Sequence, residues 1–178
     1  DNGGSFRFAL ARYLSDGSPD PGFGSNGLAS VSFGPSSNSV AQAVKFLPDG
    51  KILACGYTDV GSPVKFALAR LQSDGTPDPA FGTNGTVTTG FTGNAYAYRL
   101  AILPDGKILL GGQMLFNTLA MARYLPDGSP DPAFGNAGQL TVPDIAFVND
   151  MAVDSAGRIL VAADYQEVNN AYFTVYRF

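Results

Sequence analysis

The residues with the clearest potential for chemistry are aspartates that recur in pairs within one repeated loop. The members of each pair lie within five residues of each other, and the pairs are Asp16 with Asp20, Asp74 with Asp78, and Asp127 with Asp131. Two neighbouring carboxylates suit calcium, but this ion takes six to eight oxygens, and an EF-type loop carries a denser acidic run that ends in glutamate. Turn formation and ion pairing account for the aspartates as well. We therefore expect no cofactor, with calcium as the alternative.

An arginine recurs near the end of a repeated apolar segment that precedes this loop. The segments are Phe8–Tyr13, Phe66–Leu71, Leu119–Tyr124 and a fainter copy, Phe173–Phe178, and their arginines are Arg12, Arg70, Arg123 and Arg177. A repeated arginine can bind an anion, but beside repeated aspartates it more often forms a structural ion pair. We expect such pairs between neighbouring repeats, with the second aspartate of each loop (Asp20, Asp78 and Asp131).

The composition limits the chemistry available to the chain. Its 178 residues contain no histidine, which removes the commonest transition-metal ligand and the commonest general base. The net charge of −4 and the total of 11 lysines and arginines make nucleic acid an unfavourable partner. No apolar run approaches the length of about 20 residues that a membrane span needs. The single cysteine, Cys55, follows an apolar run and is predicted to be a buried structural thiol.

The elements that position these residues repeat with a period of roughly 55 residues, which indicates a repeat protein. A second motif, Leu47–Leu53, lies between successive loops and recurs at 103–109 and, more loosely, at 154–160. Its Asp-Gly or Ala-Gly joins two strand-length apolar runs, which is a strong signal for a β-hairpin. We therefore expect four antiparallel strands per repeat, named A to D here, as in the blades of a β-propeller.

The expected strands cover the whole chain. The first complete repeat has A at Val40–Leu47, B at Lys51–Tyr57, C at Val64–Leu71 and D at Thr86–Phe91. The second has A at Ala95–Leu103, B at Lys107–Met114, C at Leu119–Leu125 and D at Gln139–Val142. C and D strands (Phe6–Leu14, Leu28–Phe33) precede them, and A, B and C strands (Ala146–Asp154, Arg158–Tyr165, Ala171–Phe178) follow. The predicted fold class is all-β with about three propeller blades: a partial blade at 1–39, blades at 40–94 and 95–145, and a partial blade at 146–178.

The repeated motifs also resemble a known family. The order Phe-Ala-Leu-Ala-Arg-Tyr, Asp-Gly, Asp, Phe-Gly and then Pro-Asp-Gly-Lys-Ile is similar to the delta-sixty repeat of bacterial proteins, and the A–B hairpin alone resembles NHL-type blades. This resemblance covers essentially the whole chain and implies a propeller, commonly in exported or cell-surface proteins. It implies no established enzymatic activity and no catalytic residues. An extracellular or cell-surface location is therefore expected.

The expected strands do not close a ring, because propellers have about four to eight blades and an unclosed array exposes strand edges. One resolution is that the chain belongs to a longer repeat protein. Another is that several copies complete a ring as a homo-oligomer, with the A-B-C end of one copy accepting a D strand from its neighbour by strand exchange. An open head-to-tail filament is a third possibility. Of these, oligomerisation is favoured.

The loops on one expected face are near copies of one another. These are the A–B turns and the C–D loops, and their repetition suits a structural role rather than ligand recognition. Each C–D loop carries a phenylalanine that is expected to fill the gap between blades (Phe23, Phe81 and Phe134).

The loops on the other expected face, B–C and D–A, differ in every repeat. Aligning the A strands places Gln42, Tyr98 and Asn149 at one position and Ala43, Arg99 and Asp150 at the next. With Tyr165, the polar residues among these predict a ligand site near the channel mouth for a carbohydrate or a peptide (Gln42, Tyr98, Arg99, Asn149, Asp150 and Tyr165). Unselected drift of surface loops explains the variation equally well.

We therefore expect a non-catalytic binding or assembly module. One alternative is a purely structural subunit of a ring or filament. The other is a propeller hydrolase of the lactonase or esterase type, which needs a metal held by inward carboxylates and amides, or an equivalent base. Only Asp150 and Asn149, with the more distant Arg99, approach such a set, so the chain is not expected to be an enzyme.

Overall fold

The computed structural model describes residues 5–114, 117–167 and 170–177, with the backbone alone at 146, 165–167, 170–174, 176 and 177. Within these ranges, strands form four antiparallel sheets, and inside each sheet every strand pairs with its neighbours in chain order. The predicted all-β fold of four-stranded propeller blades is therefore confirmed.

The four sheets are numbered as blades 1 to 4. Blade 1 is partial and holds β1 (Phe8–Ala11) and β2 (Leu28–Val31). Blade 2 holds β3 (Ser39–Phe46), β4 (Ile52–Thr58), β5 (Lys65–Leu71) and β6 (Thr86–Thr89). Blade 3 holds β7 (Ala95–Ile102), β8 (Ile108–Met114), β9 (Thr118–Tyr124) and β10 (Gln139–Val142). Blade 4 holds β11 (Ile145–Val153), β12 (Ile159–Glu167) and β13 (Asn170–Arg177).

Some strand boundaries differ from the expected ones. β1 ends at Ala11 rather than Leu14, because the backbone N–H of Leu14 donates to the Ser18 carbonyl inside the C–D loop, at 2.8 Å. β3 and β11 begin at Ser39 and Ile145, each one residue before the expected start of its blade. The C–D loop therefore uses backbone groups that were expected to belong to β1, whereas β3 and β11 each include one residue that was expected to belong to a loop.

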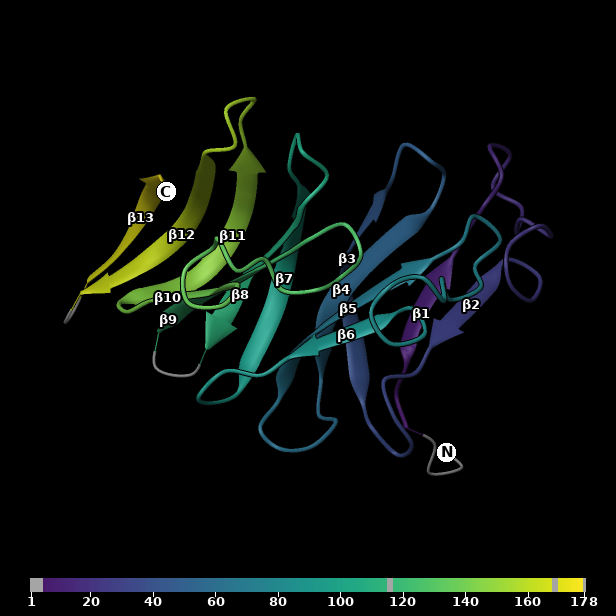
Figure 1. The fold of residues 1–178 in the computed structure, drawn as a ribbon, viewed down its shortest axis with the longest axis horizontal. Helices are drawn as coiled ribbons and strands as arrows, with labels where there is room; N and C mark the ends of the chain where they lie inside the picture. The colour runs from purple at the N-terminus through teal and green to yellow at the C-terminus, as the bar shows by residue number, and fades with distance from the viewer. Residues whose placement is uncertain (1–4, 115–116, 168–169, 178) are drawn as a thin grey trace.

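The sheets stand side by side along an arc, with the N-terminus and the C-terminus at opposite ends (Figure 1). The A strands of neighbouring blades contact each other, β3 with β7 and β7 with β11. The D strands β6 and β10 form the far edges of their sheets. The A strands therefore lie on the inner side of the arc, where a closed propeller has its central channel.

The alternation of large and small residues in the C strands fits sheets that are covered on both faces. In β5, Phe66 and Leu68 belong to the core between blades 2 and 3. Ala67 and Ala69 belong to the core between blades 1 and 2, and all four side chains are fully buried. Large side chains on one face and small ones on the other allow neighbouring sheets to interdigitate closely.

A phenylalanine from each C–D loop fills the space between blades, as predicted. Phe81 of blade 2 belongs to the same buried core as Ile108 and Leu110 of blade 3. A Cβ added to Gly128 of blade 3 would lie 2.9 Å from the Phe81 ring, and the φ of this glycine is +90°. Gly128 is therefore required both by the turn and by the ring that packs on it.

Candidate functional site

The A strands contain β-bulges at the position that the sequence predicts for ligand binding. The pairing of β3 with β4 skips Gln42, and the pairing of β7 with β8 skips Tyr98. The pairing of β11 with β12 skips Asn149 in the same way. A bulge takes one residue out of the ladder and re-aims its side chain, and bulges are common beside functional sites.

A small residue in strand B leaves room for each bulge. A Cβ on Gly112 would lie 1.9 Å from the Tyr96 carbonyl oxygen, and Gly56 is equally constrained in blade 2. Blade 4 has Ala163 at the equivalent position, and its ladder is interrupted at two places instead of one. The wider irregularity in blade 4 therefore accompanies the larger residue.

Three tyrosines gather beside the bulge of β7. The rings of Tyr57, from β4, and Tyr96, from β7, meet edge to face with their centroids 4.9 Å apart. Burial, together with the nearby Tyr57 and Tyr96, raises the pKa of Tyr98 above its ordinary value. All three side chains are partly buried. The cluster therefore joins strand B of blade 2 to strand A of blade 3.

Arg99 connects this cluster to blade 4. Its Nε donates to the Asn149 carbonyl oxygen at 2.7 Å, and its Nη1 donates to the Tyr98 carbonyl oxygen at 3.0 Å. Asn149 in turn donates from Nδ2 to Asp164 Oδ1 at 2.9 Å. Among the residues that the structure describes, no carboxylate oxygen lies within 4.0 Å of the Arg99 guanidinium, so its charge has no ion-pair partner there.

The structure brings together three of the six residues predicted for the ligand site, namely Tyr98, Arg99 and Asn149. Gln42 is exposed and lines a separate groove with alanines of β1 and β3. Asp150 accepts a hydrogen bond at Oδ1 from the adjacent Met151 N, at 2.8 Å, and has no recorded contact with Arg99. The side chain of Tyr165 lies outside the described residues.

Tyr57 and Tyr96 were not among the predicted site residues. The available signal was the alignment of the A strands two residues before the bulge, where Val40, Tyr96 and Phe147 coincide. Phe147 is 55% exposed, which is unusual for a large apolar side chain inside a strand. The surface of the inner strands therefore also contains apolar and aromatic residues, in addition to the residues predicted for the ligand site.

The variable loops share one face of the molecule. Asn38 lies in the D–A loop that leads into blade 2, and Asp59 lies in the B–C loop of that blade. The backbone N–H and the Nδ2 of Asn38 donate to the Asp59 carboxylate at 2.6 and 2.9 Å. In blade 2 the two kinds of variable loop therefore contact each other.

The arginine–aspartate pairs form on the opposite face. The Nε atoms of Arg12, Arg70 and Arg123 each lie 2.7 Å from Oδ2 of Asp20, Asp78 and Asp131, respectively. The expectation that these pairs join neighbouring repeats is wrong, because each C–D loop folds back on the C strand of its own blade: Asp78 N donates to the Arg70 carbonyl at 2.9 Å. The side chain of Arg177 lies outside the described residues.

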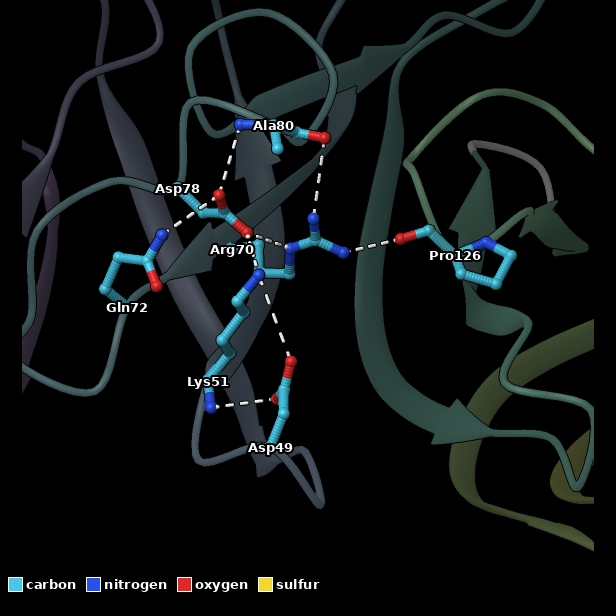
Figure 2. A network of polar contacts seen from close by, with 7 residues as sticks. All are labelled: Asp49, Lys51, Arg70, Gln72, Asp78, Ala80 and Pro126. Carbon is cyan, nitrogen blue, oxygen red and sulfur yellow. Dashed lines mark hydrogen bonds and ion pairs between the residues drawn. The ribbon is translucent and has the colours of Figure 1, made fainter.

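A different nitrogen of the same arginine joins the blades, as Figure 2 shows for Arg70. Its Nη1 donates to the carbonyl of Pro126 in blade 3 at 2.5 Å, and Nη1 of Arg12 donates to the carbonyl of Ser73 in blade 2. The guanidinium also lies over the Phe81 ring, 4.4 Å from its centroid. One side chain therefore holds its own loop and the next blade together.

The aspartates of these loops are engaged by protein donors. Asp78 is buried and accepts from Lys51 Nζ at 2.9 Å as well as from Arg70. Burial would raise the pKa of Asp78, but the hydrogen bonds from Lys51, Ala80 N and Arg70 outweigh it and hold the pKa below its ordinary value. Asp74 accepts from the backbone N–H and the hydroxyl of Thr76, at 2.9 and 2.7 Å. These are the contacts of turn formation and ion pairing.

Two further observations concern the described part of the chain. Within it, no three histidine, cysteine, aspartate or glutamate side chains gather in a way that would hold a metal ion. Nor does it contain a helix that is long and apolar enough to cross a membrane.

A comparison with protein families found one matching model, described as "Domain of unknown function (DUF5122) beta-propeller". It matches residues 1–23, 47–81 and 103–134, which together make up just over half of the chain. All three described arginine–aspartate pairs lie in the matched segments, whereas Tyr96, Tyr98, Arg99 and Asn149 lie outside them. A comparison with curated proteins found no match.

Proposed function

Since the chain belongs to the DUF5122 beta-propeller family, we propose that it is a non-catalytic binding module whose ligand sits on the inner strands, beside the variable loops. The observation that carries this proposal is the cluster of Tyr57, Tyr96 and Tyr98 with Arg99. It draws side chains from two blades, and Arg99 links it to a third. Most of the cluster lies outside the segments that define the family, so it is free to differ between members with the same scaffold.

We further propose that the repeats are of the delta-sixty type and that the module is exported or displayed on a bacterial surface. The resemblance of the repeated motifs supports both parts of this proposal. The small share of charged residues, 15%, agrees with a chain whose blades are covered on both faces.

The tyrosines favour a carbohydrate over other ligands. Aromatic rings offer a flat apolar surface for the C–H faces of a sugar, and the phenolic hydroxyls can hydrogen-bond to the sugar hydroxyls. In an edge-to-face pair such as Tyr57 and Tyr96, one ring presents its edge, so the rings do not cover each other completely. The cluster therefore has both the apolar surface and the polar groups that such a ligand needs.

Arg99 narrows the class to acidic carbohydrates. It is partly buried, and its recorded hydrogen bonds among the described residues go to neutral carbonyl oxygens. A cation withdrawn from water is stabilised by a carboxylate, which an arginine can bind through two parallel hydrogen bonds. We propose that the ligand supplies this carboxylate, as an oligosaccharide of uronic acids would.

Isothermal titration calorimetry with an oligogalacturonate and a neutral oligosaccharide of equal length tests this proposal. We expect the acidic sugar to bind at least about tenfold more tightly, which corresponds to roughly 1.4 kcal/mol. Arg99→Gln is expected to remove this preference, whereas Tyr96→Ala is expected to weaken binding of both sugars. Absence of binding by both sugars to a folded chain would overturn the carbohydrate assignment.

Matched variants separate local from general effects. Arg7→Gln removes an exposed arginine from the stretch before β1, and Tyr13→Ala removes an exposed tyrosine from the C–D loop of blade 1. Neither is expected to change the affinity. Tyr96→Phe keeps the ring and is expected to retain most of the binding, so equal losses in Tyr96→Phe and Tyr96→Ala would show that stacking is not the main contribution.

A further inference from the structure

We propose that Tyr98 determines which acidic carbohydrate the chain binds, through a hydrogen bond between its phenolic hydroxyl and one hydroxyl group of the sugar. This inference rests on the proposed function and adds to it the residue that chooses among sugars of the same charge. Two features of the inner strands support it. Residue types are divided in the same way around every described bulge, and the Tyr98 hydroxyl is available to a ligand.

The A strands β3, β7 and β11 place different kinds of residue at two positions around the bulge. Two residues before the bulge, each strand has an apolar or aromatic side chain (Val40, Tyr96 and Phe147). At the bulge itself, each strand has a side chain that can form hydrogen bonds (Gln42, Tyr98 and Asn149). An apolar surface suits the C–H face of a sugar, whereas a hydrogen-bonding group suits one of its hydroxyls. The first position therefore provides a surface, and the second provides a group that can select.

The side chain of Tyr98 is not required by the ladder of β7. The pairing of β7 with β8 passes from Ala97 directly to Arg99, so Tyr98 has no partner in the ladder. The equivalent bulges of β3 and β11 hold a glutamine and an asparagine. Side chains of different size and polarity thus fit this position on the same scaffold, as expected of a residue that sets specificity.

The hydrogen bonds recorded between Arg99 and the bulge residues go to their backbone. Arg99 Nη1 donates to the Tyr98 carbonyl oxygen at 3.0 Å, and Nε donates to the Asn149 carbonyl oxygen at 2.7 Å. A change of the Tyr98 side chain therefore leaves both acceptors of the guanidinium in place. The preference for an acidic sugar and the choice among acidic sugars then belong to two different side chains.

The hydroxyl of Tyr98 is available to a ligand. Within the described residues no hydrogen bond is recorded for it, and no buried side-chain oxygen or nitrogen there lacks a partner, so this hydroxyl reaches solvent. Tyr124 shows the opposite case, because it is 1% exposed and its hydroxyl shares a hydrogen bond of 2.6 Å with Thr89. Burial, with the nearby Tyr57 and Tyr96, raises the pKa of Tyr98 above 10.0, so at neutral pH its hydroxyl can both donate and accept.

Tyr98 is also the bulge residue that lies beside the proposed ligand. It stands between Tyr96 and Arg99 in β7, so a sugar that contacts the ring and the guanidinium together comes within reach of its hydroxyl. The side chain of Asn149 is already engaged, because its Nδ2 donates to Asp164 Oδ1 at 2.9 Å. Tyr98 is therefore better placed than Asn149 to select the ligand.

Isothermal titration calorimetry of the whole chain with three oligouronates of equal length, made of galacturonate, guluronate or mannuronate, tests this inference. The three probes carry equal charge and differ in the configuration of their rings. We expect the unchanged chain to bind the best of them at least about fivefold more tightly than the weakest. Tyr98→Phe removes only the hydroxyl and is expected to reduce this ratio to less than about twofold, while the preference for acidic over neutral sugars remains.

The possible failures of the two proposals differ. Equal affinity of the unchanged chain for the three oligouronates, or an unchanged ratio in Tyr98→Phe, would overturn the role of Tyr98 and leave the carbohydrate assignment standing. Absence of binding by all three to a folded chain would overturn the proposed function, and this inference with it.

Three further variants separate the hydroxyl from the ring and from the fold. Tyr96→Phe removes a hydroxyl at the surface position and is expected to keep the choice among the three probes, so equal narrowing by Tyr96→Phe and Tyr98→Phe would contradict the division of roles. Tyr13→Phe is the matched control, at a tyrosine that is 61% exposed in another blade. Tyr98→Asn introduces the residue of blade 4 and is expected to fold, as urea denaturation can show, and to lose the preference for the best probe. Retention of that preference in Tyr98→Asn would contradict the proposal.

Discussion

Arg70 and Asp78 belong to the same blade, with Nε and Oδ2 2.7 Å apart, yet the Arg70 guanidinium also donates to the Pro126 carbonyl of the next blade. The arginine thus connects its own loop, its own strand and the neighbouring blade. A lysine has a single point of charge and cannot place donors in three directions from one plane. This arrangement explains why arginine, and not lysine, recurs at this position.

Replacing Arg70 by lysine should therefore destabilise the fold although the charge is kept. We expect Arg70→Lys to lower the free energy of unfolding by about 2 kcal/mol, since a largely buried carboxylate and a carbonyl lose donors. Urea denaturation followed by circular dichroism measures the change. Arg7→Lys, at an exposed position, is the matched control and should change it by less than about 0.5 kcal/mol. Equal effects at the two positions would contradict the role given to Arg70.

Acid should weaken the same network. Because the pKa of Asp78 is lower in the folded chain than the ordinary value of 3.8, its carboxylate stabilises the fold above that value. This contribution is lost as the pH falls below 3.8 and through the folded pKa. We expect the urea midpoint to fall between pH 5 and pH 3. Asp78→Asn should show a lower urea midpoint at pH 5 and a smaller further decrease of that midpoint at pH 3. If the urea midpoint of this variant depended on pH as strongly as that of the unchanged chain, the assignment would be contradicted.

The thiol of Cys55 should be inert while the chain is folded. Burial raises its pKa to about 12, so almost no reactive thiolate is present at pH 8, and the side chain is inaccessible. We expect Ellman's reagent to label it only on unfolding, at a rate that rises with urea. Rapid and complete labelling in buffer alone would show that the core between blades 2 and 3 opens readily.

The bulge in β7 should depend on Gly112. An alanine there would place its Cβ 1.9 Å from the Tyr96 carbonyl oxygen, so the ladder would have to shift. We expect Gly112→Ala to cost about 3 kcal/mol of stability and to displace the tyrosine cluster. The reverse change at the equivalent position, Ala163→Gly, should cost about 1 kcal/mol or less. Near-UV circular dichroism of the tyrosines, together with denaturation, distinguishes local rearrangement from loss of the fold.

The strands and their order could be predicted from the sequence because local patterns determine them. The apolar runs on either side of Asp49-Gly50 form a hairpin through hydrogen bonds between near neighbours. An ion pair between the repeated arginine and a loop aspartate was expected from the residue types, but between neighbouring blades, whereas Arg70 pairs with Asp78 of its own blade. That depends on how the C–D loop folds back, which the residue types alone do not reveal.

The candidate site was predicted only in part, because its geometry arises between blades. Tyr57 and Tyr96 are 39 residues apart (96 − 57) and meet through the packing of β4 on β7. The bulge at Tyr98 was not foreseen, although alignment of the repeats had singled out the same position. A polar residue could be found by comparing repeats, whereas an aromatic contact across an interface could not.

The joint between blades has a direction. Blades 1 and 2 each offer an arginine, a glycine N–H and a phenylalanine ring to the blade that follows. Since these two joints have the same geometry, we expect stability to accumulate from neighbour to neighbour, as in other repeat arrays. Duplication of a whole unit in the gene would reproduce both halves of the joint at once. The number of blades can therefore change in evolution without any new contact having to arise, while a unit inserted in the opposite orientation would fit neither neighbour.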